Sequence, residues 1–256
     1  MEIITQNLVY FVVVAAIMIL LFAWAYFTKR IQKEFITVTW VLIPVAIAIN
    51  LTIGQIVLIL KLPVYLDSIG TVLVGVICGP WAGALTGALS NIIAGIILGP
   101  DWFPWFPVAA AIGATAGVMA NIGYFKSWWK VVVTGFVIAI AATIVGTPIS
   151  IAVYGGITAS GSSIITAFLL ETGRSLVGSV LTTNFIAEPL DKIATSLLAF
   201  AIIDGLSARY LSRFPNGENA AVEKGQKQTQ LIIALVIVVL LILFGIFVLP
   251  LLTSGQ

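Results

Sequence analysis

Long apolar runs, separated by shorter polar connections, form the dominant pattern of this chain. A run of about 20 residues is long enough to cross the hydrocarbon core of a bilayer as a helix. Eight runs, one of them short, predict membrane-spanning helices over residues 8–27, 38–60, 68–79, 82–98, 108–124, 131–153, 186–206 and 231–252. Residues 154–185 are less hydrophobic and rich in Gly, Ser and Thr, so they predict a long connection with one short helix over 164–170.

Two of the predicted helices carry small residues at every fourth position, which places those residues on one face of each helix. Gly inside a helix costs about 1 kcal/mol in water, but in a bilayer small residues let helix backbones approach closely. The two stripes are Gly83, Gly87, Asn91 and Gly95, then Ala109, Gly113, Gly117 and Asn121. We therefore expect tight packing of both helices, with the two asparagines forming hydrogen bonds across helices more readily than ligand contacts.

Composition supports the membrane assignment. Of the 256 residues, 61% are hydrophobic and only 9% are charged, whereas soluble domains carry about 25% charged residues. The first apolar run is followed by Lys29, Arg30 and Lys33, while a secretory signal carries its charges before the apolar region, so we expect a retained helix. The predicted fold class is all-α, a polytopic membrane helix bundle.

The positive charges are distributed unevenly between the two sides of this predicted topology. The connections after the first, third, fifth and seventh spans hold nine Lys and Arg residues, and the opposite side holds three. Because cytoplasmic connections are enriched in positive residues, both termini are expected outside. The connections at 62–67, 99–107 and 154–185 then face outward together.

Several kinds of chemistry are missing from the sequence. There is no His, and a single Cys78 excludes an internal disulfide and a multi-cysteine metal site. No G-x-x-x-x-G-K-[ST] phosphate-binding loop occurs, so energy from ATP has to come through another chain. A pair of acids within the spans, suited to ion coupling, is also missing. We expect a chain that is not an enzyme and binds no cofactor or metal.

The outward connections concentrate the polar and aromatic residues. Aromatic walls with a few polar groups are typical of small-molecule pockets, and charges near a membrane boundary are often functional. Proline residues at 100, 104 and 107 stiffen one connection and fix its rings. Such rings near Asp101 and Glu171 suit a flat or cationic molecule. The candidate binding residues are Tyr65, Asp67, Asn91, Trp102, Phe103, Trp105, Phe106, Glu171, Arg174, Asn184, Glu188, Asp191 and Lys192.

Simpler explanations exist for the same residues. The rings also fit an interfacial belt that anchors helix ends. Glu188, Asp191 and Lys192 also fit the first turn of a helix, where acids are favoured by the macrodipole. Glu171 and Arg174, three positions apart, also fit a local ion pair.

Four segments, in order, resemble the substrate-binding S component of an energy-coupling factor (ECF) transporter. They are DSIGT at 67–71, GPWAG at 79–83, the Gly-rich helix with Asn91, and EPLDK at 188–192. The resemblance covers about residues 37–212. It implies a six-helix core over 37–212. The predicted membrane helix within 1–36, and the cytoplasmic loop and membrane helix within 213–256, have no counterpart in that six-helix pattern.

The resemblance also implies a function. Such a subunit captures a vitamin or related micronutrient at the outer face of a prokaryotic plasma membrane, and delivers it inward together with a T subunit and two ATPases of an ABC-type importer. The connection at 62–67 corresponds to the family's gate. A family docking patch of small residues has its nearest equivalents at Ala46, Ala48 and Thr52.

Three other classes remain open from the residues alone. A stand-alone secondary transporter would need coupling-ion ligands deep in the bilayer, for which Asn50, Gln55, Asn91 and Asp204 are the candidates. A membrane sensor subunit is the second alternative. A lipid-modifying membrane enzyme is the third, and the lack of His and of a clustered acid dyad disfavours it.

Overall fold

The computed structural model describes residues 30–60, 62, 64–220, 232 and 236, and these residues form helices joined by short connections, without a strand among them. The predicted span at 8–27 lies outside the described residues, as does nearly all of the span at 231–252. The prediction of eight spans therefore concerns partly residues that the structure does not describe. The predicted all-helical class is confirmed for the rest.

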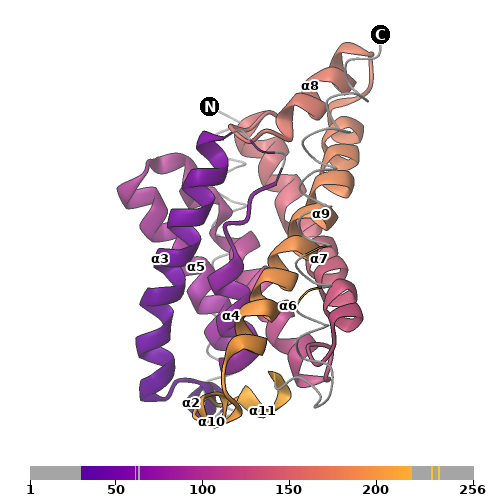
Figure 1. Cartoon of the computed structure of the whole chain (residues 1–256). Helices are drawn as coiled ribbons and strands as arrows, with labels where there is room; N and C mark the ends of the chain where they lie inside the picture. Colours follow the sequence, from indigo (N-terminus) through magenta and orange to yellow (C-terminus); the bar gives the residue numbers. More distant parts are fainter. Residues whose placement is uncertain (1–29, 61, 63, 221–231, 233–235, 237–256) are drawn as a thin grey trace.

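The helices follow one another along the chain with few intervening residues (Figure 1). Helices occupy five of the ranges predicted as spans, within a few residues of the expected bounds. The elements are α2 (Arg30–Glu34), α3 (Thr37–Ile59), α4 (Ile69–Cys78), α5 (Pro80–Ile97), the 3-10 helix η1 (Pro100–Trp105), α6 (Phe106–Asn121), α7 (Trp128–Tyr154), α8 (Ser163–Glu171), α9 (Leu176–Gly205), α10 (Ala208–Leu211) and α11 (Gly217–Ala220).

Four of these helical stretches are long and apolar enough to cross a membrane. They are Thr37–Ile59, Pro80–Ile97, Pro100–Asn121 and Trp128–Tyr154. Large apolar side chains point outward from them, for example Ile96 at 72% and Ile144 at 68% exposure. Apolar outer faces suit contact with lipid, because a bilayer does not penalise them as water does. The fold is compatible with a multi-pass membrane protein.

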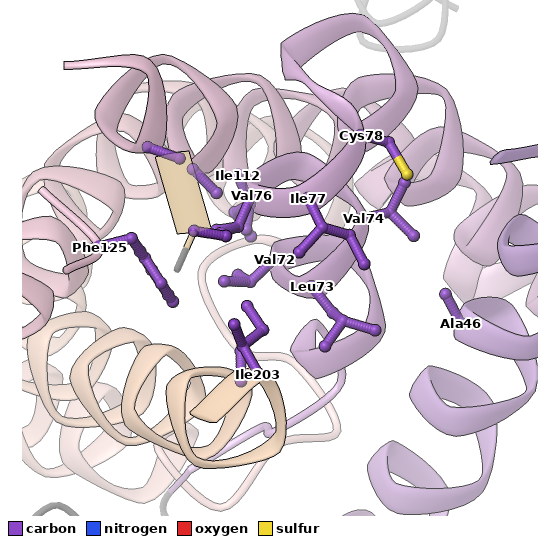
Figure 2. Packing of buried hydrophobic residues seen from close by; sticks show 14 of the residues in the cluster. Ala46, Val72, Leu73, Val74, Val76, Ile77, Cys78, Ile112, Phe125 and Ile203 are labelled. Carbon is purple, nitrogen blue, oxygen red and sulfur yellow. The ribbon is translucent and has the colours of Figure 1, made fainter. Parts of the chain in front are cut away.

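The short helix α4 lies at the centre of the bundle, and all ten of its residues are buried. Figure 2 shows its side chains, among them Val72 and Ile77, surrounded by Ala46, Ile112, Phe125 and Ile203 from other segments. A ten-residue helix is too short to span a bilayer by itself. Burial on every face explains why its sequence is apolar without a polar stripe.

Helices α4, α5 and α6 pack with their backbones in close approach, as the small-residue stripes predict. A Cβ added to Gly83 would lie 2.6 Å from the carbonyl oxygen of Gly113, and one added to Gly75 would lie 2.5 Å from the same atom. Gly87 meets the backbone of Ala109 in the same way. The predicted tight packing of the two striped helices is confirmed. The stripe of small residues on α5 packs directly against the stripe on α6.

A polar residue joins three helices inside the apolar core. The Asn50 amide donates hydrogen bonds to Thr71 Oγ1 at 2.8 Å and to Ser90 Oγ at 2.9 Å, and its oxygen accepts one from the Gly70 N–H at 2.7 Å. Asn50 is buried, so α3 has a polar position directed into the protein. Asn121, by contrast, is exposed at the end of α6.

Helix α9 begins ten residues earlier than the expected span at 186–206, inside the stretch that hydropathy assigns to a connection. Its small polar residues form hydrogen bonds within the bundle. The Ser175 hydroxyl accepts one from the Gly178 N–H at the helix start, and Thr166 donates one of 2.8 Å to Thr183. At 1.5 Å per residue, the 30 residues of α9 extend about 45 Å.

The two ends of the bundle differ in content. Helices α2, α10 and α11 lie together at one end, and α8 lies at the opposite end (Figure 1). Glu34 of α2 accepts hydrogen bonds from the N–H groups of Trp81 and Ala82, at 2.8 and 2.9 Å, at the start of α5. At the α8 end, the connection from α3 to α4 runs into the bundle toward the short α4.

Candidate functional site

A cavity of about 320 Å³ lies at the α8 end of the bundle. Its walls come from the connection before α4, from η1, from the connection between α7 and α8, and from α3, α5, α6, α7, α8 and α9. The volume falls in the range of pockets that hold small molecules. Eight of the residues proposed from the sequence line it: Tyr65, Asp67, Asn91, Trp102, Trp105, Asn184, Glu188 and Lys192.

The other candidate residues do not line the cavity. Phe103 packs over Gly95, and Phe106 packs on the alanines of α5 and α6. Glu171 and Arg174 are exposed at the end of α8 and just after it. Asp191 is completely buried beside Lys192.

Acidic groups surround the ammonium group of Lys192. Its Nζ lies 2.5 Å from Asp191 Oδ2, 3.8 Å from Glu188 Oε2 and 4.0 Å from Asp67 Oδ1. The Lys192 side chain is 3% exposed and that of Glu188 is 12% exposed. Buried charges are retained in proteins when they are paired, and this group is paired on several sides.

Three members of this cluster, Glu188, Asp191 and Lys192, lie near the middle of α9, twelve or more residues after its first residue. The alternative that Glu188, Asp191 and Lys192 cap a helix start is therefore wrong. Glu188 and Asp191 lie on one long helix, α9, which is not among the four helical stretches that are long and apolar enough to cross a membrane. The three residues do not cap the helix because α9 starts earlier than expected, with first turns made of small polar residues that hydropathy assigns to a connection.

Asp191 fixes the connection between α3 and α4. Its Oδ1 accepts hydrogen bonds from the N–H groups of Tyr65 at 2.7 Å and of Leu66 at 2.8 Å. Leu66 has a φ of 49°, a left-handed conformation that a leucine rarely adopts. The carboxylate stabilises this backbone conformation by pairing two adjacent N–H groups.

Tyr65 connects that segment to the opposite wall. Its phenol oxygen and the Ser162 hydroxyl share a hydrogen bond of 2.8 Å, and Lys192 Nζ lies 5.4 Å from its ring centroid. Burial, followed by the nearby Glu188 carboxylate, raises the pKa of the Tyr65 phenol. The phenol therefore stays protonated at physiological pH and keeps its hydrogen bond.

Aromatic rings form a second part of the wall. Trp105 and Tyr154 stack with ring centroids 5.4 Å apart and an interplanar angle of 12°. The Tyr154 hydroxyl donates a 2.5 Å hydrogen bond to the carbonyl oxygen of Asp101, which holds η1 against the end of α7. Trp102 also lines the cavity. The rings expected from the proline-rich segment thus divide, with the two tryptophans inside and the two phenylalanines outside.

Hydroxyl groups form a third part of the wall, which the sequence analysis did not identify. They bond mainly to one another: Thr158 to Ser163 at 2.9 Å, Ser160 to Ser162 at 2.8 Å. The available signal is the density of Ser and Thr between 158 and 166, which reads as a connection because it has no helical period. The cavity-lining hydroxyl residues from this part of the chain are Thr158, Ser160, Ser162, Ser163 and Thr166.

Two buried acceptor atoms at the cavity receive no hydrogen bond from the described residues. They are Gln55 Oε1 and Glu188 Oε2. Most buried polar side-chain atoms have a hydrogen-bond partner. Both residues line the cavity, so a bound molecule with N–H or O–H donors would satisfy them.

The described residues include no group of three or more His, Cys, Asp or Glu side chains arranged to hold a metal ion. The acids of the Lys192 cluster are spread around an ammonium group. Such an arrangement of charged groups suits the binding of a ligand by charge and hydrogen bonds.

The residues expected to contact a partner subunit lie on α3. Ala46 is completely buried, and its backbone contacts Gly70 of α4. Ala48 and Thr52 are exposed on the outer face of the same helix. Of the three, only these two are accessible from outside in this conformation.

Comparison of the chain with protein-family models, with curated proteins and with solved structures finds no match. The geometry of the cavity and the residues that line it therefore provide the evidence for function.

Proposed function

We propose that this chain is the substrate-binding subunit of an importer, a membrane-embedded receptor that captures a small molecule. The cavity carries this proposal, because three connections far apart in the sequence converge with six helices around one volume of about 320 Å³. Its wall combines charged, aromatic and hydroxyl groups, as small-molecule sites do.

The resemblance to ECF S components supports a more specific form of the proposal. The six helices α3, α4, α5, α6, α7 and α9 would form the S-component core. Asp67, Glu188 and Lys192, which belong to the segments that carry the resemblance, line the cavity. In this form, a vitamin-like micronutrient binds from the outer face, and a T subunit with two ATPases drives its release inside.

Native mass spectrometry of the protein purified from its own membranes tests the receptor function. We expect a small molecule to copurify with the chain at one per protein. The Trp102→Ala variant, which alters the cavity wall, should carry less of it, and Trp129→Ala, exposed on the far end of α7, should carry as much as the wild type. A chain that carries no molecule, and acquires none from a cell extract, would contradict the proposal.

The Lys192 cluster supports one alternative. Paired acids and a lysine within a long helix also occur in the proton and ion pathways of secondary transporters. Uptake into liposomes separates the two functions: an importer subunit takes up nothing without its ATPase partners, and a secondary transporter takes up substrate alone when an ion gradient is imposed.

A further inference from the structure

The charge of the cavity wall is strongly unbalanced. Among the described residues that line it, three carry carboxyl groups, Asp67, Asp101 and Glu188, and one carries a cationic group, Lys192. Lys192 is already matched by Asp191, which lies behind the wall at 2.5 Å. The wall therefore presents an excess of negative charge to a bound molecule.

Glu188 contributes a carboxyl group to the negative charge of the cavity wall. Its Oε2 is buried and receives no hydrogen bond from the described residues, and the nearest cation is Lys192 at 3.8 Å, beyond hydrogen-bond distance. Gln55 Oε1 is a second buried acceptor at the same cavity. Both atoms are acceptors, so a ligand that pairs with them has to supply hydrogen-bond donors. A cationic N–H donor binds a carboxylate more strongly than a neutral N–H donor does.

The rings favour the same ligand. Trp105, stacked on Tyr154, and Trp102 border the cavity that holds these acceptors. The face of an aromatic ring attracts a cation, and Trp attracts it most strongly. A flat ring with delocalised positive charge would use the carboxylates and the aromatic faces together.

We infer that the ligand of this cavity is a flat, positively charged molecule with N–H donors, such as an aromatic amidinium or an aminated heterocycle. The inference rests on the proposed receptor function and specifies its substrate class. An anionic ligand would meet three carboxyl groups and an ammonium group that Asp191 already neutralises.

Three planar probes of nearly equal size and different charge test the inference: benzamidinium, benzamide and benzoate. Their binding to the full chain in lipid nanodiscs can be measured by ligand-observed NMR titration, with empty nanodiscs as the reference for partition into lipid. We expect benzamidinium to bind at least tenfold more tightly than benzamide, and benzoate to bind more weakly than both.

Variants of single residues then test whether the carboxyl groups of the cavity wall cause the preference for benzamidinium. Glu188→Gln keeps the side-chain shape and removes the charge, so we expect benzamidinium affinity to fall about tenfold with little change for benzamide. Glu171→Gln, an exposed acid away from the cavity, is the matched control and should leave both affinities unchanged. Asp67→Asn provides a second test of the wall if Glu188→Gln does not fold, as judged from its melting temperature.

The outcomes separate the substrate class from the function. Tighter binding of benzamide or benzoate than of benzamidinium, or equal loss in the two Glu variants, overturns the inference and leaves a receptor for another class of molecule. Failure of all three probes to bind, in a protein that also copurifies with no small molecule, overturns the receptor function and the inference together.

Discussion

At the scale of single residues, Asp191 performs two structural tasks. Its Oδ1 pairs two adjacent N–H groups of the connection before α4, and its Oδ2 lies against Lys192. The Asp191→Asn variant keeps an acceptor for the two N–H groups and loses the charge beside the ammonium. Because unpairing a buried ion costs about 3–5 kcal/mol, we expect a clear drop in melting temperature in detergent. An unchanged melting temperature would show that Glu188 and Asp67 suffice to pair Lys192.

Trp102 is the residue at which ring stacking can be tested with least damage to the fold. It lines the cavity from η1, whereas Trp105 also packs against the main hydrophobic core. One cation–π contact contributes about 0.5–2 kcal/mol, so Trp102→Ala should weaken benzamidinium binding about tenfold in the nanodisc titration. Trp129→Ala, 50% exposed at the start of α7, is the control. Equal affinities in both variants would remove Trp102 from the binding site.

At the scale of helices, the close approach of α5 and α6 depends on the absence of side chains. A Cβ at Gly83 would lie 2.6 Å from the backbone oxygen of Gly113, and backbone cannot move aside as a flexible side chain can. We expect Gly83→Ala to lower stability by about 1–3 kcal/mol through overpacking. The same substitution at Gly205, where nothing lies within 4 Å of the added Cβ, should be tolerated. Thermal unfolding of both variants in detergent measures the difference.

The hydrogen bonds between Glu34 of α2 and the start of α5 should make the stability of the fold depend on pH. Burial raises the pKa of the Glu34 carboxyl from its ordinary 4.5 to about 7, against the lowering effect of hydrogen bonds from Ala82 and Trp81. The folded chain then binds this proton more tightly than the unfolded chain. The contribution of Glu34 is complete below pH 4.5 and is lost as pH rises through about 7.

Melting temperatures of the wild type and of Glu34→Gln between pH 5 and pH 8 test whether the ionisation of Glu34 affects stability. We expect the wild type to lose more stability than the variant across that range, because glutamine does not ionise. Parallel curves for the two proteins would mean that the ionisation of Glu34 is not coupled to folding.

At the scale of the whole molecule, regular periodicity was the most reliable guide. The small-residue stripes of α5 and α6 fix one face by helix geometry alone, and those faces meet. The start of α9 was not predictable from hydropathy, because residues such as Thr183 count as polar although they form hydrogen bonds inside the bundle. The site did not follow the same rule. Asp67 in a connection and Glu188 on α9 both line the cavity as predicted, whereas Glu171, the last residue of α8, is exposed and does not line it.

The arrangement of the whole bundle predicts which membrane face each connection reaches. Asp101 in η1, which lines the cavity, and Glu171 at the end of α8 are exposed at the α8 end of the bundle, and Asn121 is exposed at the far end of α6. Because Cys78 is buried, single cysteines can be introduced at these positions in a Cys78→Ser background. The nine positive residues assigned to the Asn121 side favour a cytoplasmic location for that end.

A membrane-impermeant maleimide applied to intact cells should therefore label Asp101→Cys and Glu171→Cys, and should label Asn121→Cys only after permeabilisation. Expression and membrane insertion of each variant are checked by labelling in permeabilised cells. Labelling of Asp101→Cys and Glu171→Cys from opposite faces would contradict a single cavity-bearing end. Labelling of both from the cytoplasm alone would keep the cavity and reverse the direction from which its ligand enters.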